Sequence, residues 1–333
     1  MGASRGGGNG TIICMSHGYK DIISLENLYE AWQEFVRGKK QKRDVMEFSM
    51  HLSLNIFNLH QDLKAKTYTH GGYHAFNISD PKPRNIHKAT VRDRLLHHAI
   101  YRVLYPHFDT KFVHDSYSCR LYKGTHRALK RLGQFGRKVS KNNTKTVWIL
   151  KCDVRKFFAS IDQKILVEIL QIHIKDKNIL WLLGEVISSF HTELAKGLPL
   201  GNLTSQLLVN VYMDWFDQWM KHRLRAKYYI RYADDFVVMS RDKSELENIL
   251  IQIRFFLKEN LSLDLHQNKV FITTLASGVD FLGWVHFPHH RVLRTVTKRR
   301  MLKNLKDNLS KETKTSYKGM LTWGNAYKIM NMI

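Results

Sequence analysis

Two adjacent aspartates, Asp234 and Asp235, stand inside the run YYIRYADDFVVMS at 228–240. The rest of this run is rich in Tyr, Ile, Phe and Val, which favour a pleated strand, whereas Asp is depleted in strands and costly to bury without a partner. One interpretation is a tight hairpin turn with its carboxylates facing water, because Asp tolerates turn geometry. The other keeps the hairpin and adds a divalent cation, which takes oxygen ligands and offsets the negative charge.

A third aspartate, Asp153, ends the apolar part of TVWILKCDV at 146–154, a pattern typical of a buried strand. Taken alone, Asp153 fits the N-cap of a helix over the KFFASID segment that follows. Antiparallel strands of one sheet would instead bring it beside Asp234 and Asp235, and clustered carboxylates repel one another unless cations lie between them. Two divalent ions meet that need, and they can activate an attacking hydroxyl and stabilise a leaving phosphate oxygen. The expected ions are two Mg²⁺, with Mn²⁺ as a substitute.

The charge of the chain points to a polyanionic partner. Its 333 residues include 53 Lys and Arg against 29 Asp and Glu, a formal net charge of +24, and binding to phosphates releases counterions and attracts the partner from a distance. No apolar run approaches the ~20 residues of a membrane span, so no membrane partner is expected. The three cysteines, Cys14, Cys119 and Cys152, form no C-x-x-C pair, which is typical of a reducing compartment.

The elements that must position the carboxylates alternate between helical and strand-like patterns. Apolar residues at intervals of three and four predict helices over 25–66, 91–105, 161–190, 204–220 and 243–259. Alternating apolar residues predict a hairpin over 72–88, strands over 146–154 and 269–273, and a second hairpin over 280–287. The first ten residues are Gly-rich and predict a flexible tail, and the segment from Arg291 onward is basic with helical spacing.

The motifs, in this order, resemble those of reverse transcriptases. KCDVRKFFASID is similar to the first metal-binding motif of that family, and RYADDFVV to its Y-x-D-D motif. PKPRNIHKATVRDRLLHHAI and HDSYSCRLYKGTHRAL resemble the fingers motifs, LSLDLHQNK the motif with a lysine near the leaving pyrophosphate, and VDFLGWVHF the primer-grip region. The resemblance implies an α+β right-hand polymerase with fingers, an RRM-like antiparallel-sheet palm and a short helical thumb.

The resemblance also implies domain bounds and a location. A flexible tail is expected over 1–10, fingers over 11–107, a palm over 108–287 with a fingers insertion around 161–195, and a basic helical thumb over 288–333. The implied location is the cytoplasm, with a bacterial, archaeal or phage gene as the source.

Roles at the metal site can be carried over residue by residue. Asp153 and Asp234 resemble the principal metal ligands, and Asp235 resembles their acidic neighbour. Val154, directly after Asp153, is expected to belong to the same metal site. Phe158 matches the steric gate, an aromatic ring that would clash with a ribose 2′-hydroxyl, although beside its neighbour Phe157 it also fits core packing.

The remaining substrate contacts are basic. Lys82 and Arg84 resemble the fingers residues that contact the incoming triphosphate, and Arg120 lies in the second fingers block; charge-assisted bonds from such groups suit phosphate. Lys269 matches the general acid of the family, although a lone Lys in a strand is also typical of a solvated surface.

The segment GLPLGNLTSQ at 197–206 corresponds to the loop and helix start that pack against template and nucleotide. Relatives of the group II intron type read Q-G-x-x-x-S-P here, whereas this chain has Leu200 before Gly201 and Gln206 in place of Pro. That departure resembles the reverse transcriptases of diversity-generating retroelements. Leu200 removes an amide beside the nascent base pair and can loosen base discrimination. Alternatively, Ser205 caps the following helix and Gln206 is an ordinary second-turn residue.

The expected function is RNA-directed DNA polymerisation that copies a template-repeat RNA into cDNA and misincorporates opposite adenines. The implied substrates and partners are template and primer RNA, cDNA, dNTPs and a small basic helical accessory protein that is itself oligomeric. Two alternatives stay open: a defence-associated or group II intron-like reverse transcriptase of ordinary fidelity, and a non-catalytic RNA-binding scaffold.

Overall fold

The computed structural model describes residues 18–79, 83–307 and 310–332, and its chain divides into two compact units. Unit 1 consists of Met1–Thr110, Val167–Ser189 and Gly201–Thr204. Unit 2 consists of Lys111–Leu166, Phe190–Leu200 and Ser205–Ile333. Each unit is described by itself.

Helices make up most of unit 1. Ser24 caps α2 by accepting a hydrogen bond from the Asn27 amide, and the buried residues Leu28, Trp32 and Phe35 recur at helical spacing. The helices predicted over 25–66 and 91–105 are confirmed. The helices of this unit are α1 (Tyr19–Ile23), α2 (Leu25–Phe35), α3 (Arg43–Met50), α4 (Leu52–Ala65), α5 (Val91–Asp109), α8 (Gln163–His173, which begins in unit 2) and α9 (Lys177–Ser188).

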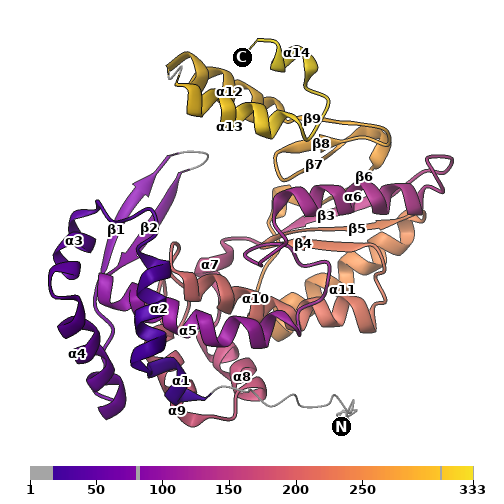
Figure 1. The fold of residues 1–333 in the computed structure, drawn as a ribbon. Helices are drawn as coiled ribbons and strands as arrows, with labels where there is room; N and C mark the ends of the chain where they lie inside the picture. The colour runs from indigo at the N-terminus through magenta and orange to yellow at the C-terminus, as the bar shows by residue number, and fades with distance from the viewer. Residues whose placement is uncertain (1–17, 80–82, 308–309, 333) are drawn as a thin grey trace, which may run out of the picture. The chain divides into compact units, whose positions relative to one another are not determined.

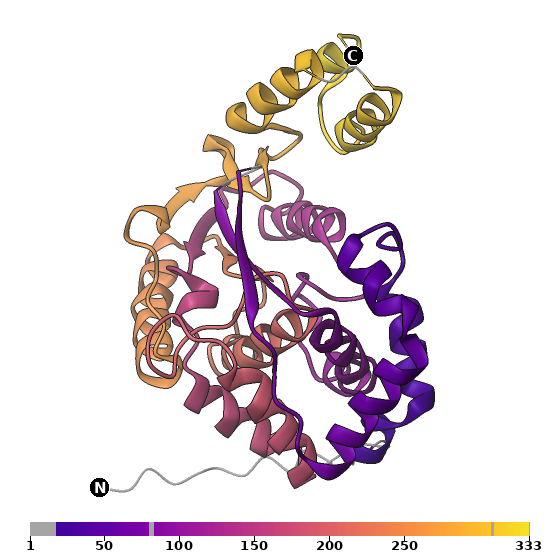
Figure 2. The same ribbon diagram turned by 90° about the vertical axis from the view of Figure 1, so that its left-hand side faces the viewer.

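The hairpin predicted over 72–88 is confirmed. Strands β1 (Tyr73–Ile78) and β2 (Arg84–Ala89) pair antiparallel, with Tyr73 opposite Ala89 and Ile78 opposite Arg84. Figure 2 shows the two strands as a long ribbon. Much of the PKP turn that joins them, including Lys82, lies outside the described residues.

Unit 2 contains a four-stranded antiparallel sheet in the order β4-β5-β3-β6 (Figure 1). Its strands are β3 (Trp148–Asp153), β4 (Tyr229–Tyr232), β5 (Asp235–Ser240) and β6 (Phe271–Thr274). Helix α6 (Thr125–Val139) packs against β4 and β5, whereas α11 (Lys243–Leu261) packs against β3, β5 and β6. Helix α10 (Leu203–Gln218) lies on the α11 side, because Phe216 contacts both Phe236 and Phe256.

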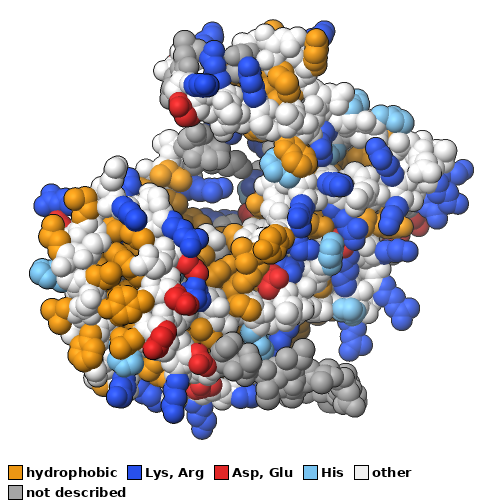
Figure 3. All heavy atoms as spheres, viewed as in Figure 1, with side chains coloured by type: hydrophobic (Ala, Val, Ile, Leu, Met, Phe, Trp, Pro, Cys, Tyr) orange, Lys and Arg blue, Asp and Glu red, His pale blue; other side chains and the backbone are white. Residues whose placement is uncertain are grey.

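Basic side chains are spread over the surface. Lys and Arg are scattered over the face seen in Figure 3, and acidic side chains are few there. Within the described parts of the chain, no helix combines the length and the apolar character that crossing a bilayer requires.

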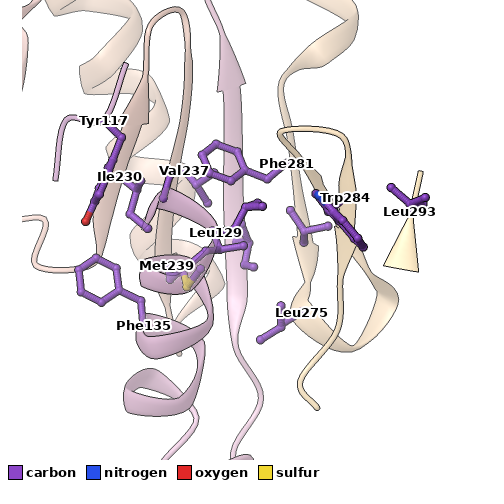
Figure 4. Packing of buried hydrophobic residues seen from close by; sticks show 14 of the residues in the cluster. Tyr117, Leu129, Phe135, Ile230, Val237, Met239, Leu275, Phe281, Trp284 and Leu293 are labelled. Atoms are coloured by element: carbon purple, nitrogen blue, oxygen red, sulfur yellow. The ribbon is translucent and has the colours of Figure 1, made fainter. Parts of the chain in front are cut away.

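Strands β3 and β5 of this sheet are covered on both faces, which explains their nearly continuous apolar sequences. On β5, Val237 and Met239 face the α6 side and join a buried cluster with Leu129 and Phe135 (Figure 4). Phe236, which directly precedes Val237 and so points to the opposite face, faces α10 instead. The alternation therefore places Asp235 on the same face as Val237, at the end of the strand.

Unit 2 also contains elements outside this sheet. Trp284 of β8 packs so closely on Gly324 that an added Cβ would lie 2.0 Å from its ring, so only Gly fits there. The remaining elements are α7 (Phe157–Ser160), a π-helical turn (Trp219–Arg223), two 3₁₀ turns (Gln267–Lys269 and Leu275–Ser277), β7 (Val279–Phe281), β8 (Trp284–His286), β9 (Arg291–Leu293), α12 (Thr295–Asp307), α13 (Lys311–Leu321) and α14 (Tyr327–Met330).

Two local predictions need correction. The strand predicted over 269–273 begins at Phe271, because Lys269 belongs to a 3₁₀ turn in which the His266 side chain accepts a hydrogen bond from the Asn268 amide. Ser205 is not an N-cap, because α10 already begins at Leu203 and so contains Ser205 in its first turn.

Candidate active site

Two strands place the aspartates at one end of the sheet. Asp153 is the last residue of β3, Asp235 is the first of β5, and the antiparallel register sets them directly opposite each other. Tyr232 pairs with Asp235 at the end of the β4-β5 hairpin, so Ala233 and Asp234 form a two-residue loop. The sequence predicted this hairpin. It also follows that Asp153 does not cap α7, whose N-cap is Lys156.

The backbone around Asp234 is held on a constrained path. Ala233 has φ +56°, in the left-handed region, which costs a residue other than Gly about 1–2 kcal/mol. The Val154 amide donates to the Asp234 carbonyl at 3.0 Å, and the His266 amide donates to the Asp153 carbonyl at 2.8 Å. Val154 is itself buried. These bonds tie the hairpin loop directly to the end of β3.

Two lysines partly balance the negative charge. Lys269 Nζ lies 2.9 Å from Asp153 Oδ1, and Lys151 Nζ lies 3.4 Å from Asp235 Oδ2. Burial, together with the charges of Asp234 and Asp153, raises the pKa of Asp235 to about 7, although Lys151 acts in the opposite direction. Among the described residues, Asp235 Oδ1 is a buried oxygen with no hydrogen-bond partner. One carboxylate oxygen at this end of the sheet is therefore unsatisfied in the part of the chain that the structure describes.

The donor set suits a hard divalent cation. Carboxylate oxygens are ligands that Mg²⁺ prefers. The buried Asp235 oxygen has no hydrogen-bond partner among the described residues, and a bound cation would offset the free energy lost by burying it. Over 18–79, 83–307 and 310–332, however, no three His, Cys, Asp or Glu side chains are arranged so that they could hold an ion as they stand. Mg²⁺ is usually held by one or two carboxylates together with substrate phosphates. The residues thus fit a metal site that substrate completes.

Phe158 lies beside the loop at Gly197 and Leu198 in unit 2. The Leu198 amide donates to the Phe158 carbonyl at 2.8 Å, and the Gly197 amide donates to Ile161 at the same distance. Phe157 is buried, whereas its neighbour Phe158 remains partly exposed and meets it edge to face at 5.7 Å. The core-packing interpretation therefore describes Phe157 better than Phe158.

Gly201, in the segment at 197–206, is required by its conformation. Gly201 has φ +111°, and a Cβ there would lie 2.9 Å from the Ile86 side chain, so both backbone and space require Gly. Leu200 and Gln206 are partly exposed, and Gln206 lies in the first turns of α10.

The basic candidates differ in their surroundings. Arg120 Nη1 donates to the carbonyls of Val113 at 2.8 Å and Ser116 at 3.1 Å, so its guanidinium holds its own loop together. Arg84 is exposed at the start of β2. Lys82 lies outside the described residues.

Two residues at this site were missed from the sequence. Lys151 precedes Asp153 by two positions in β3, and the strand period of two signals that both side chains share a face. Arg231 of β4 is buried, with 1% of its surface exposed. An arginine in an apolar strand was the available signal, since Arg is almost never buried unless it is paired.

A family profile matches a large part of this chain. A profile described as "Reverse transcriptase (RNA-dependent DNA polymerase)" matches residues 78–286, which is more than half of the chain. The chain therefore belongs to the reverse transcriptase family.

Relatives in sequence are distant. Protein YkfC of Escherichia coli is 24% identical over 65% of this chain and 65% of its own length. The group II intron-encoded protein LtrA of Lactococcus lactis is 23% identical over 61% of this chain and 44% of its own length. A putative COX1/OXI3 intron 2 protein of Saccharomyces cerevisiae is 23% identical over 41% of this chain and 23% of its own. The chain thus spans less than two thirds of the length of these relatives.

Solved structures share the fold. Telomerase from Candida albicans, in complex with a fragment of telomeric RNA, aligns with a TM-score of 0.54 at 11% identity, covering 78% of this chain and 52% of that one. Apo telomerase from Candida tropicalis aligns with a TM-score of 0.50 at 12% identity, covering 65% and 46%. The mixed helix and sheet architecture is consistent with a right-hand polymerase.

Proposed function

We propose that this chain is an RNA-directed DNA polymerase that works by two-metal nucleotidyl transfer. The observation that carries the proposal is the register that sets Asp153 opposite Asp235, with Asp234 in the adjoining loop. Neighbouring carboxylates repel one another, and in a polymerase this repulsion is offset when cations bind together with the substrate phosphates. Membership of the reverse transcriptase family supports the same reaction.

Each residue near the carboxylates has a role in this proposal. When bound, divalent ions activate the attacking hydroxyl and neutralise charge on the phosphates. Asp153 and Asp234 hold the Mg²⁺ ions, Mn²⁺ being the substitute, with Val154 fixing the Asp234 backbone. Lys151 steadies the buried Asp235 carboxylate. Lys269, close to Asp153, delivers a proton to the leaving pyrophosphate.

The domain roles follow the same proposal. The β1-β2 hairpin and its helices act as fingers, the sheet with Asp153 as an RRM-like palm, and the helices after residue 288 as a thumb. Lys82 and Arg84 contact the triphosphate of the incoming dNTP. Arg120 acts through the loop that it holds. Phe158 excludes a ribose 2′-hydroxyl.

We propose further that the enzyme is of the diversity-generating kind. Leu200 and Gln206 support this subtype, because an apolar side chain replaces the amide beside the nascent base pair. The expected product is cDNA with substitutions opposite template adenines, and the expected partner is a small basic helical accessory protein. A second candidate, a group II intron-like enzyme of ordinary fidelity, is favoured by the similarity to proteins named as intron-encoded.

The polymerase proposal is tested by Asp234→Asn. This change keeps the size of the side chain and removes a charged metal ligand, so primer extension on a defined RNA should fall by at least ~10³-fold while RNA affinity is retained. Asp264→Asn, at an exposed carboxylate of the same unit, is the matched control and should extend normally. Extension that survives in Asp234→Asn would refute the metal assignment, and a wild-type protein that binds RNA without copying it would favour the scaffold alternative.

The subtype is tested by sequencing cDNA made on a template of equal base composition, with and without the accessory protein. Substitutions should concentrate at template adenines, and Leu200→Gln should reduce that bias because it restores an amide beside the base pair. Errors spread evenly over the four template bases would sink the diversity-generating subtype and leave the ordinary-fidelity candidate.

A further inference from the structure

Arg231 is a buried arginine close to the carboxylates. It lies on β4 with only 1% of its surface exposed, and its side chain points to the α10 side of the sheet. An unpaired charge at such a depth is strongly unfavourable, so its partners define what it can do.

The guanidinium has four kinds of partner. Nε and Nη2 bind the two oxygens of Asp217 at 2.8 and 2.6 Å, in a bidentate ion pair. Nη2 also donates to Ser116 Oγ at 3.1 Å. Nη1 donates to Asn210 Oδ1 at 3.4 Å and to the Ala233 carbonyl at 3.1 Å. The last bond joins this pair to the loop that carries Asp234.

Asp217 is held independently of Arg231. It belongs to α10, is fully buried, and accepts a hydrogen bond from the Tyr229 hydroxyl at 2.5 Å. The Arg231 main chain is fixed as well, because its amide donates to Asp115 and its carbonyl accepts from Tyr117, each at 3.0 Å. Both members of the ion pair are therefore held in place, Asp217 on α10 and the Arg231 main chain on β4.

The Ala233 carbonyl belongs to the peptide that leads into Asp234. Ala233 has a positive φ of 56°, a conformation that Gly adopts more readily, so this loop needs outside support. The peptide on the other side of Asp234 is held by the Val154 amide at 3.0 Å. Arg231 and Val154 thus fix the backbone before and after the carboxylate.

We propose that Arg231 is a positioning residue for nucleotidyl transfer: anchored by Asp217, it holds the Ala233 carbonyl and so sets the direction in which the Asp234 carboxylate projects. This inference rests on the proposed polymerase function. Small displacements of a reacting group are costly, since misplacement by about 1 Å can lower a rate by ~10²-fold. The ion pair that stabilises the core also orients a metal ligand.

Lysine is the informative replacement. Arg231→Lys keeps the charge that compensates Asp217, but a single ammonium cannot reproduce a bidentate pair together with bonds to Ser116 and Ala233. It should lower kcat by at least ~10-fold, leave the KM for dNTP and the affinity for primer-template within ~3-fold, and shift the Mg²⁺ dependence of kcat to higher concentration. Mn²⁺ binding to the complex with primer-template and a non-hydrolysable dNTP, followed by water proton relaxation, should weaken in parallel.

A matched control separates positioning from stability. Tyr212 lies on α10, the helix that carries Asp217, and its hydroxyl donates a buried hydrogen bond to the Leu261 carbonyl at 2.6 Å. Tyr212→Phe removes this bond and leaves the Ala233 loop untouched. It should lower the unfolding midpoint without changing kcat or Mn²⁺ binding. If Tyr212→Phe reproduces the kinetic changes of Arg231→Lys at equal loss of stability, Arg231 is only structural and the inference is wrong.

The remaining outcomes also decide the matter. If Arg231→Lys fails to fold, Ser116→Ala removes one guanidinium bond more gently and should show the same metal signature at a smaller size; unchanged Mn²⁺ binding in that variant would overturn the inference. Wild-type protein that binds Mn²⁺ but does not extend a primer would instead count against the proposed function. A folded Arg231→Lys variant with normal kcat and normal Mn²⁺ binding would remove only the positioning role.

Discussion

Asp214 is a buried carboxyl on α10 whose ionisation depends on its surroundings. Burial and the nearby charge of Asp217 raise its pKa to about 7, although Gln218 donates a hydrogen bond to it. The pKa in the unfolded chain is about 3.9, so as the pH rises the unfolded chain releases this proton first. The free energy of unfolding should therefore fall by up to about 1.4 kcal/mol per unit between pH 4 and 7 and level off above pH 7.

Asp214→Asn should remove this contribution, because Asn has the same shape and no proton to lose. Urea unfolding at pH 4, 6 and 8 should show a variant whose stability relative to wild type increases with pH, by a few kcal/mol in total. Parallel pH profiles for the two proteins would show that Asp214 ionises normally in the folded state.

Single residues were predictable where chemistry and local pattern coincide. Asp153 and Asp234 stood out because carboxylates interrupt apolar strands. Arg231 could not be understood from the sequence, since its partner Asp217 lies 14 positions away on another element and only the fold brings them together. The ion pair between Lys151 and Asp235 could not be predicted either, because it depends on which face of β3 the Lys151 side chain occupies.

At the scale of elements, α6 offers two glycines in different surroundings. Gly133 is exposed with no atom within 4 Å of an added Cβ, whereas a Cβ on Gly136 would lie 2.9 Å from Leu275 in the buried cluster. Gly133→Ala should stabilise unit 2 by about 0.5–1 kcal/mol through helix propensity. Gly136→Ala should be less stable than Gly133→Ala by about 1–3 kcal/mol because of overpacking, as measured by urea unfolding. Equal effects would mean that the cluster adjusts freely.

The sequence predicted the hairpins and most of the long amphipathic helices. It did not predict helix α6 or the first residues of β6 and α10. Helix α6 was not anticipated, because its two glycines lower its helix propensity and its apolar face becomes clear only when plotted at a period of 3.6. The start of β6 was misplaced by the 3₁₀ turn at Lys269, and α10 begins before the Ser205 that was expected to cap it. Such boundaries depend on side-chain caps rather than on periodicity.

For the whole molecule, the charge of +24 should govern nucleic-acid affinity. The exposed face of α6 and the residues just after it carry several basic side chains and no acidic one: Arg127, Lys130, Arg137, Lys138 and Lys141. Neutralising Arg137 and Lys138 together as glutamines should reduce the slope of log affinity against log salt by about 1.5 if both contact phosphates.

The matched control is Lys243→Gln with Lys258→Gln on α11. Both of these lysines pair with acidic side chains, Glu247 and Asp264, so their charge is already balanced locally. The salt slope for a structured RNA should stay unchanged in this control. An equal reduction in both double variants would mean that binding follows net charge and not the α6 face.

The ammonium groups of Lys151 and Lys269 lie beside the carboxylates of Asp235 and Asp153 before any substrate binds. They offset part of the negative charge that folding brings together at this end of the sheet, so we expect the protein to fold without Mg²⁺. Purification in the presence of a chelator should yield intact protein whose activity returns as soon as ions and nucleotide are added together.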